Sequence, residues 1–247
     1  MSYFEYLPSE MLELIVYRLH SDDLESFILS YDIKTKINWS RVHLYLLNVY
    51  KSIDYDEYHR LISLERLSDK LGLRFTIQDL DRLVILNLNC RRISNIPKDI
   101  GSMKILKILN LDTNWIEEIP KDLGNCKFLN DVNLCNNRIT EIPIEICYLP
   151  FLQILNLHKN KIKEIPPQIG NLEKLIVLHI SENKIENLPK ELGYLSNVEI
   201  LSLRDNKIKS LPIELLRLKN LKILTISNNP IKEIHRDLKV LITNDKK

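Results

Sequence analysis

Residues 152–166 read LQILNLHKNKIKEIP, and the same arrangement of residue types recurs along most of the chain. Copies in register with it begin at residues 83, 106, 129, 175, 198 and 221, so each copy starts 23 residues after the one before. In the last copy His235 stands where the other copies have proline. A period held over seven copies without an insertion predicts an array of like structural units.

Apolar residues occupy positions 1, 4, 6, 11, 14, 18 and 21 of each copy, too many to be buried within one unit of 23 residues. Each copy must therefore stack on its neighbours, which predicts a solenoid. Positions 3 to 7 alternate, with 4 and 6 pointing inward, so each copy supplies one short strand of a parallel sheet. The proline at position 15 predicts a short helical or 3₁₀ turn on the convex side. We expect the glycines at position 19 to give this turn a left-handed exit: Gly101, Gly124, Gly170 and Gly193.

Position 9 is asparagine in six copies, namely Asn114, Asn137, Asn160, Asn183, Asn206 and Asn229. Its amide can satisfy backbone groups of adjacent turns, so this ladder is interpreted as structural. The first copy has Arg91 instead, which predicts that its loop is irregular or is capped by the residues that precede it. At the other end Leu238, Leu241 and Ile242 are placed to cap the array.

These copies resemble the leucine-rich repeat family, whose pattern is LxxLxLxxNxIxxIPxxIxxL. The resemblance covers about residues 83–242 and implies an α/β leucine-rich-repeat solenoid with a curved parallel sheet. It assigns residues 83–247 to seven repeats and a C-terminal cap, with ligands held on the concave face.

Outward positions of the repeats carry the candidate binding residues. Position 10 is basic in five of the seven copies and has Trp115 within the basic row, which favours an acidic protein partner. A simply solvated edge is the alternative, because Glu117, Glu118, Glu182 and Asp205 lie close enough to neutralise the row. With outward residues from positions 5 and 7, the predicted substrate-binding set is Trp115, Arg138, His158, Lys161, His179, Lys184 and Arg204.

Asp112, Cys135 and His158 fall at position 7 of three successive copies, which raises a metal site or a nucleophile as a further reading. The face is open, however, and offers neither an activating pocket nor an oxyanion donor. The sequence therefore predicts no catalytic residue, no metal site and no cofactor.

The stretch LPSEMLELIVYRLHSDDL, residues 7–24, lies outside the repeat and has its own pattern. Pro8 suits a first helical turn, Glu10 complements the helix N-terminus, and the following apolar residues recur at helical spacing. Asp22 and Glu25 are spaced as a capping box for a second helix.

This stretch resembles the F-box, whose pattern is roughly LPxEhhxxIhxxLxxxDL, over residues 5–45; Trp39 is the single counterpart of the segment that follows in that family. The resemblance implies an all-α module over residues 1–45 that docks on a Skp-type adaptor of a cullin-RING ubiquitin ligase, while the repeats select a protein substrate. The adaptor-binding residues it implies are Leu7, Pro8, Glu10, Met11, Leu12, Ile15, Leu19 and Leu24.

Two other readings stay open. Residues 1–82 as a whole are long enough to be a cap, although residues 46–82 alone, with Leu61, Leu64, Leu67 and Leu71 as a buried stripe, are enough for a helical linker and cap. The repeats also resemble leucine-rich signalling scaffolds associated with small GTPases, which have no ligase link.

Charge and composition bound the remaining expectations. Thirty-five basic and 33 acidic residues give a formal charge of +2, which argues for neither nucleic acid nor membrane binding. The first residues show no signal peptide, and the four cysteines form no CxxC pair, so we expect reduced thiols. The expected location is the cytoplasm of the source cell or of a host cell, or the nucleus. Outside the ligase complex we expect a monomer.

Overall fold

The computed structural model describes residues 55–73 and 75–242 of the chain, with side chains from residue 59 onward. The chain divides into two compact units, residues 1–66 and 67–247. The predicted module over residues 1–45 lies outside the described residues. Among the described residues no helix is long and apolar enough to cross a membrane.

Two helices precede the repeats. Helix α4 spans Tyr55–Lys70 and ends before Gly72, whose φ of 60° is the left-handed value that closes a helix. Helix α5 spans Ile77–Asp81 and begins with a capping box between Thr76 and Asp79. Of the predicted leucine stripe, Leu61, Leu64 and Leu67 are fully buried and Leu71 is half-buried.

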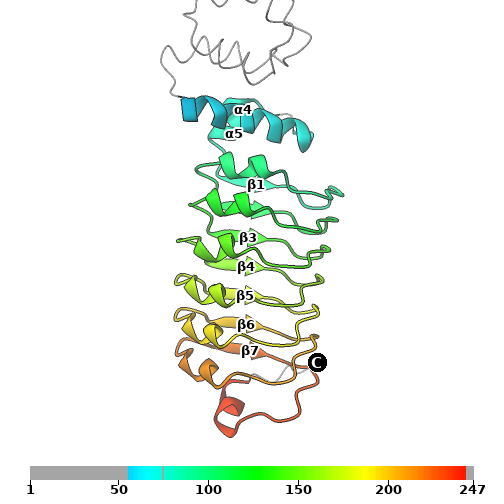
Figure 1. The fold of residues 1–247 in the computed structure, drawn as a ribbon, viewed down its shortest axis with the longest axis vertical. Helices are drawn as coiled ribbons and strands as arrows, with labels where there is room; N and C mark the ends of the chain where they lie inside the picture. The colour runs from blue at the N-terminus through cyan, green and yellow to red at the C-terminus, as the bar shows by residue number, and fades with distance from the viewer. Residues whose placement is uncertain (1–54, 74, 243–247) are drawn as a thin grey trace, which may run out of the picture. The chain divides into compact units, whose positions relative to one another are not determined.

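Seven strands of three residues each form one parallel sheet in sequence order. Successive strands pair at a shift of 23 residues, for example Leu155 with Leu178, so equivalent positions of all repeats lie side by side (Figure 1). The predicted α/β solenoid and its register are therefore confirmed. The strands are β1 (Ile85–Asn87), β2 (Ile108–Asn110), β3 (Asp131–Asn133), β4 (Ile154–Asn156), β5 (Val177–His179), β6 (Ile200–Ser202) and β7 (Ile223–Thr225).

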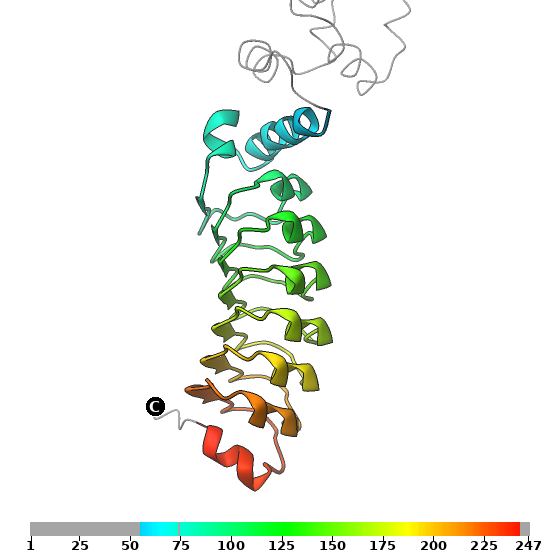
Figure 2. The same ribbon diagram turned by 90° about the vertical axis from the view of Figure 1, so that its left-hand side faces the viewer.

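A 3₁₀ turn follows each strand on the opposite, convex side, as Figure 2 shows. The turns are η3 (Lys98–Ser102), η4 (Lys121–Asn125), η5 (Ile144–Tyr148), η6 (Pro167–Asn171), η7 (Lys190–Tyr194), η8 (Ile213–Arg217) and η9 (Arg236–Leu241). Proline precedes each of the first six, since its fixed φ suits the entry to a helical turn. At η9 the His235 ring accepts a hydrogen bond from the Asp237 backbone amide instead.

The position-9 asparagines hold neighbouring repeats together as predicted. Asn160 is typical: its Oδ1 accepts from the Ile139 amide at 3.0 Å, while its Nδ2 donates to the carbonyls of Leu134, Leu157 and His158. The residue at position 8 takes a left-handed φ of 52° to 57° in every repeat, which turns the chain away from the strand. In the first repeat Arg92 is left-handed as well, so the predicted irregularity there is confirmed.

The prediction of a left-handed exit at the position-19 glycines is wrong. In the part of the chain that the structure describes, Gly72 is the one glycine with positive φ. The repeat glycines are instead needed for close stacking: a Cβ added to Gly124 would lie 2.8 Å from the Glu145 carbonyl oxygen of the next turn. At Gly193 the corresponding distance to the Glu214 carbonyl oxygen would be shorter still.

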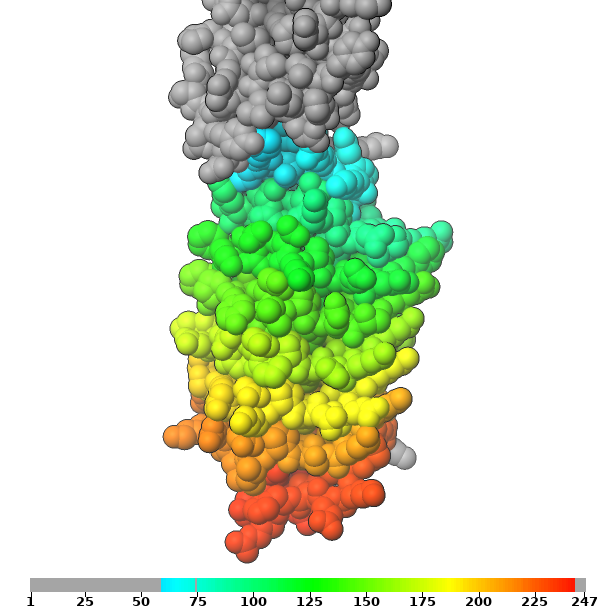
Figure 3. Space-filling view, in the orientation of Figure 1, coloured from blue at the N-terminus to red at the C-terminus, as the bar shows by residue number. Residues whose placement is uncertain are grey.

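Leucine and isoleucine side chains from all seven repeats form a continuous core, and each repeat packs directly on the next (Figure 3). At the C-terminal end Leu238 is buried, while Leu241 and Ile242 are half-buried, so they cover the last repeat in part. All four cysteines lie in the described part of the chain and none forms a disulfide.

Candidate functional site

The outward face of the sheet carries an aliphatic row at position 3 of the repeats. Six of its seven members are aliphatic, and the end members are well exposed, Ile85 by 54% and Ile223 by 40%. This row was not among the predicted binding residues. Its members are Ile85, Ile108, Asp131, Ile154, Val177, Ile200 and Ile223.

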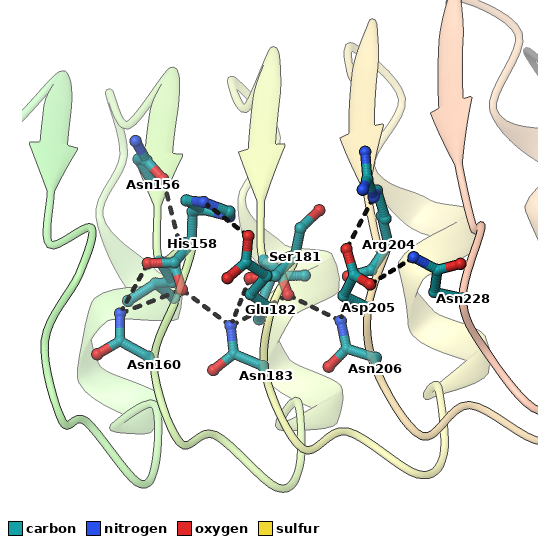
Figure 4. A network of polar contacts seen from close by, with 12 residues as sticks. Asn156, His158, Asn160, Ser181, Glu182, Asn183, Arg204, Asp205, Asn206 and Asn228 are labelled. Atoms are coloured by element: carbon teal, nitrogen blue, oxygen red, sulfur yellow. Dashed lines mark hydrogen bonds and ion pairs between the residues drawn. The ribbon is translucent and has the colours of Figure 1, made fainter. Parts of the chain in front are cut away.

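A row of amides at position 5 runs beside the aliphatic row. In each of Asn87, Asn110, Asn133 and Asn156 the side-chain Oδ1 accepts a hydrogen bond from the backbone amide two residues later, at 3.0–3.2 Å. This bond fixes each side chain and turns its Nδ2 away, as Figure 4 shows for Asn156. The four Nδ2 groups form no hydrogen bond with another described residue, so the amide row presents fixed donors to a ligand.

The aliphatic row and the amide row together line a shallow hollow of about 340 Å³ that crosses β2 to β6. Asp131 stands in this hollow, between Ile108 and Ile154 of the neighbouring strands. Burial raises the pKa of its carboxyl group above the ordinary value.

A second, more polar hollow of about 420 Å³ adjoins the first and shares Asn156 and His179 with it. Three predicted substrate-binding residues line it: His158, His179 and Arg204. Each is engaged within the protein, because His158 Nε2 lies 3.6 Å from Glu182 and Arg204 donates to Asp205 at 2.7 Å (Figure 4).

His179 connects the two hollows. Its Nδ1 lies 3.0 Å from the Ser202 hydroxyl, and burial, with a smaller contribution from the charge of His158, lowers its pKa. His179 is therefore uncharged at neutral pH and offers hydrogen bonding rather than charge.

The other four predicted residues lie outside the hollows, on a ridge at position 10. Trp115 is 46% exposed and is held between two guanidinium groups, those of Arg92 at 5.9 Å and Arg138 at 5.6 Å from its ring centroid. Arg138, Lys161 and Lys184 are exposed and form no salt bridge with any residue between 59 and 242 that the structure describes. Of the acids expected to neutralise the ridge, Glu182 lies 3.6 Å from His158 and Asp205 pairs with Arg204, both in the polar hollow.

The position-7 residues considered for chemistry do not form an activated site. Burial, the charge of Asp112 and a side-chain hydrogen bond to it raise the pKa of Cys135 to about 11, opposite to what a thiolate nucleophile needs. Among the described residues no group of three or more His, Cys, Asp or Glu side chains is arranged to hold a metal ion.

The predicted adaptor-binding residues cannot be placed on this surface. They lie outside the described residues: Leu7, Pro8, Glu10, Met11, Leu12, Ile15, Leu19 and Leu24.

Comparison with known proteins identifies the repeat. Residues 121–199 match the family described as leucine-rich repeat region, and residues 173–231 match the family described as leucine rich repeat. No curated protein matches the chain.

Solved structures share the architecture. The chain is similar to the plant peptide hormone receptor RGFR1 in complex with RGF2, with 28% identity, a TM-score of 0.56 and coverage of 64% of this chain and 26% of that one. It is also similar to a TDR receptor, with 29% identity, a TM-score of 0.57 and coverage of 62% and 28%. This chain thus spans little more than a quarter of either receptor. The register of the sheet, the asparagine ladder and these matches establish that the repeats form a leucine-rich-repeat solenoid.

Proposed function

We propose that the chain is a non-catalytic scaffold whose concave face binds a protein or peptide. The observation that carries this proposal is the outward-facing aliphatic row, which is exposed at its ends and half-buried between them, because a partner that covers six aliphatic side chains in line gains free energy. The fixed donors of the amide row add directional contacts beside it. The likeness to a plant peptide hormone receptor in complex with RGF2 supports a peptide or protein as the kind of partner.

The electrostatics of the concave face fit a binding role without catalysis. Cys135 is a poor nucleophile because its thiol stays protonated at neutral pH. The hollows are shallow and open to water, whereas acid–base or nucleophilic catalysis needs a group held against an enclosed substrate.

The test compares two matched pairs of substitutions in affinity capture from the cells that express the protein. The concave pair is Ile154→Gln with Val177→Gln; the convex pair is Ile144→Gln with Ile213→Gln, two isoleucines that are each 46% exposed on 3₁₀ turns. We expect partners to be retained by the wild type and the convex pair and lost from the concave pair. Partners that the concave pair retains would contradict a concave binding site.

The sequence at residues 7–24 indicates a more specific role for this scaffold. We propose that the N-terminal module docks on a Skp-type adaptor and that the protein is the substrate receptor of a Skp-cullin-F-box ubiquitin ligase. The support is the match of Leu7, Pro8, Glu10, Leu19 and Leu24 to the F-box pattern. This role would place the protein in the cytoplasm or nucleus, where a fluorescent fusion would locate it.

Co-elution with a purified Skp-type adaptor tests the ligase role separately. The wild type and Trp115→Ala should co-elute with the adaptor, whereas Leu7→Ala combined with Pro8→Ala should not. Failure of the wild type to bind, or retention by the double variant, would remove the ligase role. The alternative would then be a signalling scaffold of the kind associated with small GTPases.

A further inference from the structure

Asp131 interrupts the aliphatic row within the less polar hollow of about 340 Å³. Its register neighbours are Ile108 and Ile154, and the next members along the row are Val177 and Ile200. Its carboxylate is half-buried and forms neither a hydrogen bond nor a salt bridge with the described residues.

The fold does not require an acid at this position. Every other repeat places an aliphatic side chain there, and aspartate is poorly suited to the middle of a strand. Burial is the sole cause of the raised pKa of Asp131, so no basic side chain among the described residues compensates the charge. A partly desolvated carboxylate without a partner is unfavourable, and a cation from a ligand would relieve that cost.

The amide row indicates what carries the cation. Asn110, Asn133 and Asn156 hold their Nδ2 donors in line along the hollow, one per strand, at the spacing of about 4.8 Å between neighbouring strands. Such donors can bond to some of the carbonyl groups of an extended chain that crosses the strands, whereas a small cation would leave them unused.

We infer that the concave face binds an extended peptide segment that sets a lysine or arginine against Asp131 and apolar side chains two and four residues away from it. This inference rests on the proposed function and names the class of ligand for the same surface.

Spacing along the row supports the pattern. In an extended peptide every second side chain points the same way, about 6.7 Å apart. Measured from Asp131, Ile154 and Val177 lie about 5 and 10 Å along the row, and Ile200 lies about 14 Å along it. The residue two away from the basic one therefore falls between Ile154 and Val177, and the residue four away falls at Ile200. The preferred segments therefore begin with a basic residue and have apolar residues at the third and fifth positions, or have the same pattern in reverse order.

Selection from a display library of random heptapeptides tests this inference on the full-length protein. The wild type should enrich peptides with the basic–apolar spacing about tenfold over the starting library, the factor that one charge pair of about 1.4 kcal/mol supplies. Asp131→Asn should keep apolar peptides and lose the basic preference, and Asp131→Lys should select Asp or Glu in its place. Asp112→Asn changes an acid that lies just after the neighbouring strand β2 and is engaged by Cys135; it is the matched control and should select as the wild type does.

The outcomes separate the inference from the proposed function. Three results would overturn the inference alone. The selected concave-face peptides could show no preference for a basic residue, or Asp131→Asn could keep that preference. Basic residues could also be enriched without the apolar spacing. No enriched peptide, or enrichment that survives Ile154→Gln with Val177→Gln, would overturn the proposed function as well. Self-association in sedimentation that the same pair abolishes would identify a second copy of the chain as the occupant and would also overturn the inference.

Discussion

Removal of one ladder asparagine should destabilise the solenoid far more than removal of an asparagine that does not bridge repeats. In Asn160→Ala the backbone of two adjacent repeats loses an acceptor for the Ile139 amide and donors to three carbonyls. The side chain is only 9% exposed, so water does not readily replace it.

The size of the effect follows from the bonds that break. Three of the four are 2.9–3.1 Å long and the fourth, to the His158 carbonyl, is 3.3 Å long. At about 1 kcal/mol for each of the three shorter bonds, the free energy of unfolding falls by about 3 kcal/mol. For an array of this size that loss lowers the melting temperature by about 6–12 °C.

Asn156→Ala is the matched control, four residues earlier in the same repeat. Its side chain accepts one hydrogen bond, from the His158 amide at 3.1 Å, and bridges no repeats. We expect a loss of about 1 kcal/mol or less. Thermal melts followed by circular dichroism, with urea titration as a second measurement, compare the two variants. Equal shifts would refute the assignment of the ladder as the main polar link between repeats.

Three further predictions concern other positions. Gly124→Ala should cost about 1–3 kcal/mol of unfolding free energy because the new Cβ meets the next turn, whereas Gly72→Ala, with no atom within 4 Å, should show only the milder backbone cost of its positive φ; chemical denaturation distinguishes them. Lys159→Asn should raise stability by about 0.5 kcal/mol because asparagine tolerates the φ of 55°, and Lys161→Asn should not. The pKa of Cys135 is raised to about 11, so thiol labelling of the folded protein at this residue should be slow at pH 8 and accelerate toward pH 11. The pKa of this thiol is higher in the folded than in the unfolded state, so the thiol contributes to the stability of the folded state at neutral pH. That contribution is lost as pH rises through about 9 to 11. A melting temperature that rises over this pH range would contradict the prediction.

The sequence was sufficient to predict the repeat boundaries, the strand register and the role of the asparagines. Each of these depends on a strict period, and the period is visible because neighbours such as Leu155 and Leu178 must meet in the stack. The 3₁₀ turns were predicted for the same reason, since proline precedes them at a fixed position. The glycine prediction failed because glycine serves two purposes, left-handed backbone and close approach, and the sequence alone does not distinguish them.

The aliphatic row was missed because charge and aromatic character drew attention to other columns of the same face. The position-3 residues are aliphatic, and in a stretch such as ILNL an aliphatic residue next to a buried strand position looks like part of the core. The predicted alternation already turned position 3 outward, and the structure confirms it with Leu155 inward and Ile154 outward, but an aliphatic residue was not considered as a binding residue. Asp131 was the available signal, because it is the one polar residue in an otherwise aliphatic column.

Asp131 in the hollow and the basic residues of the ridge together favour a partner that carries both signs of charge at set positions, rather than a uniformly charged one. With a net charge of +2 the protein exerts little long-range attraction on either sign of partner, so selection must come from contacts within the screening distance of about 8–10 Å. Asp131 favours a basic residue in the hollow, whereas Arg138, Lys161 and Lys184 on the ridge favour acids that stay in water. A segment with a basic residue among apolar ones and acidic residues to one side satisfies both, and a polybasic segment is disfavoured by the ridge. The position-7 row adds little unpaired charge between them, because its members His158, Arg204 and Asp112 are already engaged with Glu182, Asp205 and Cys135.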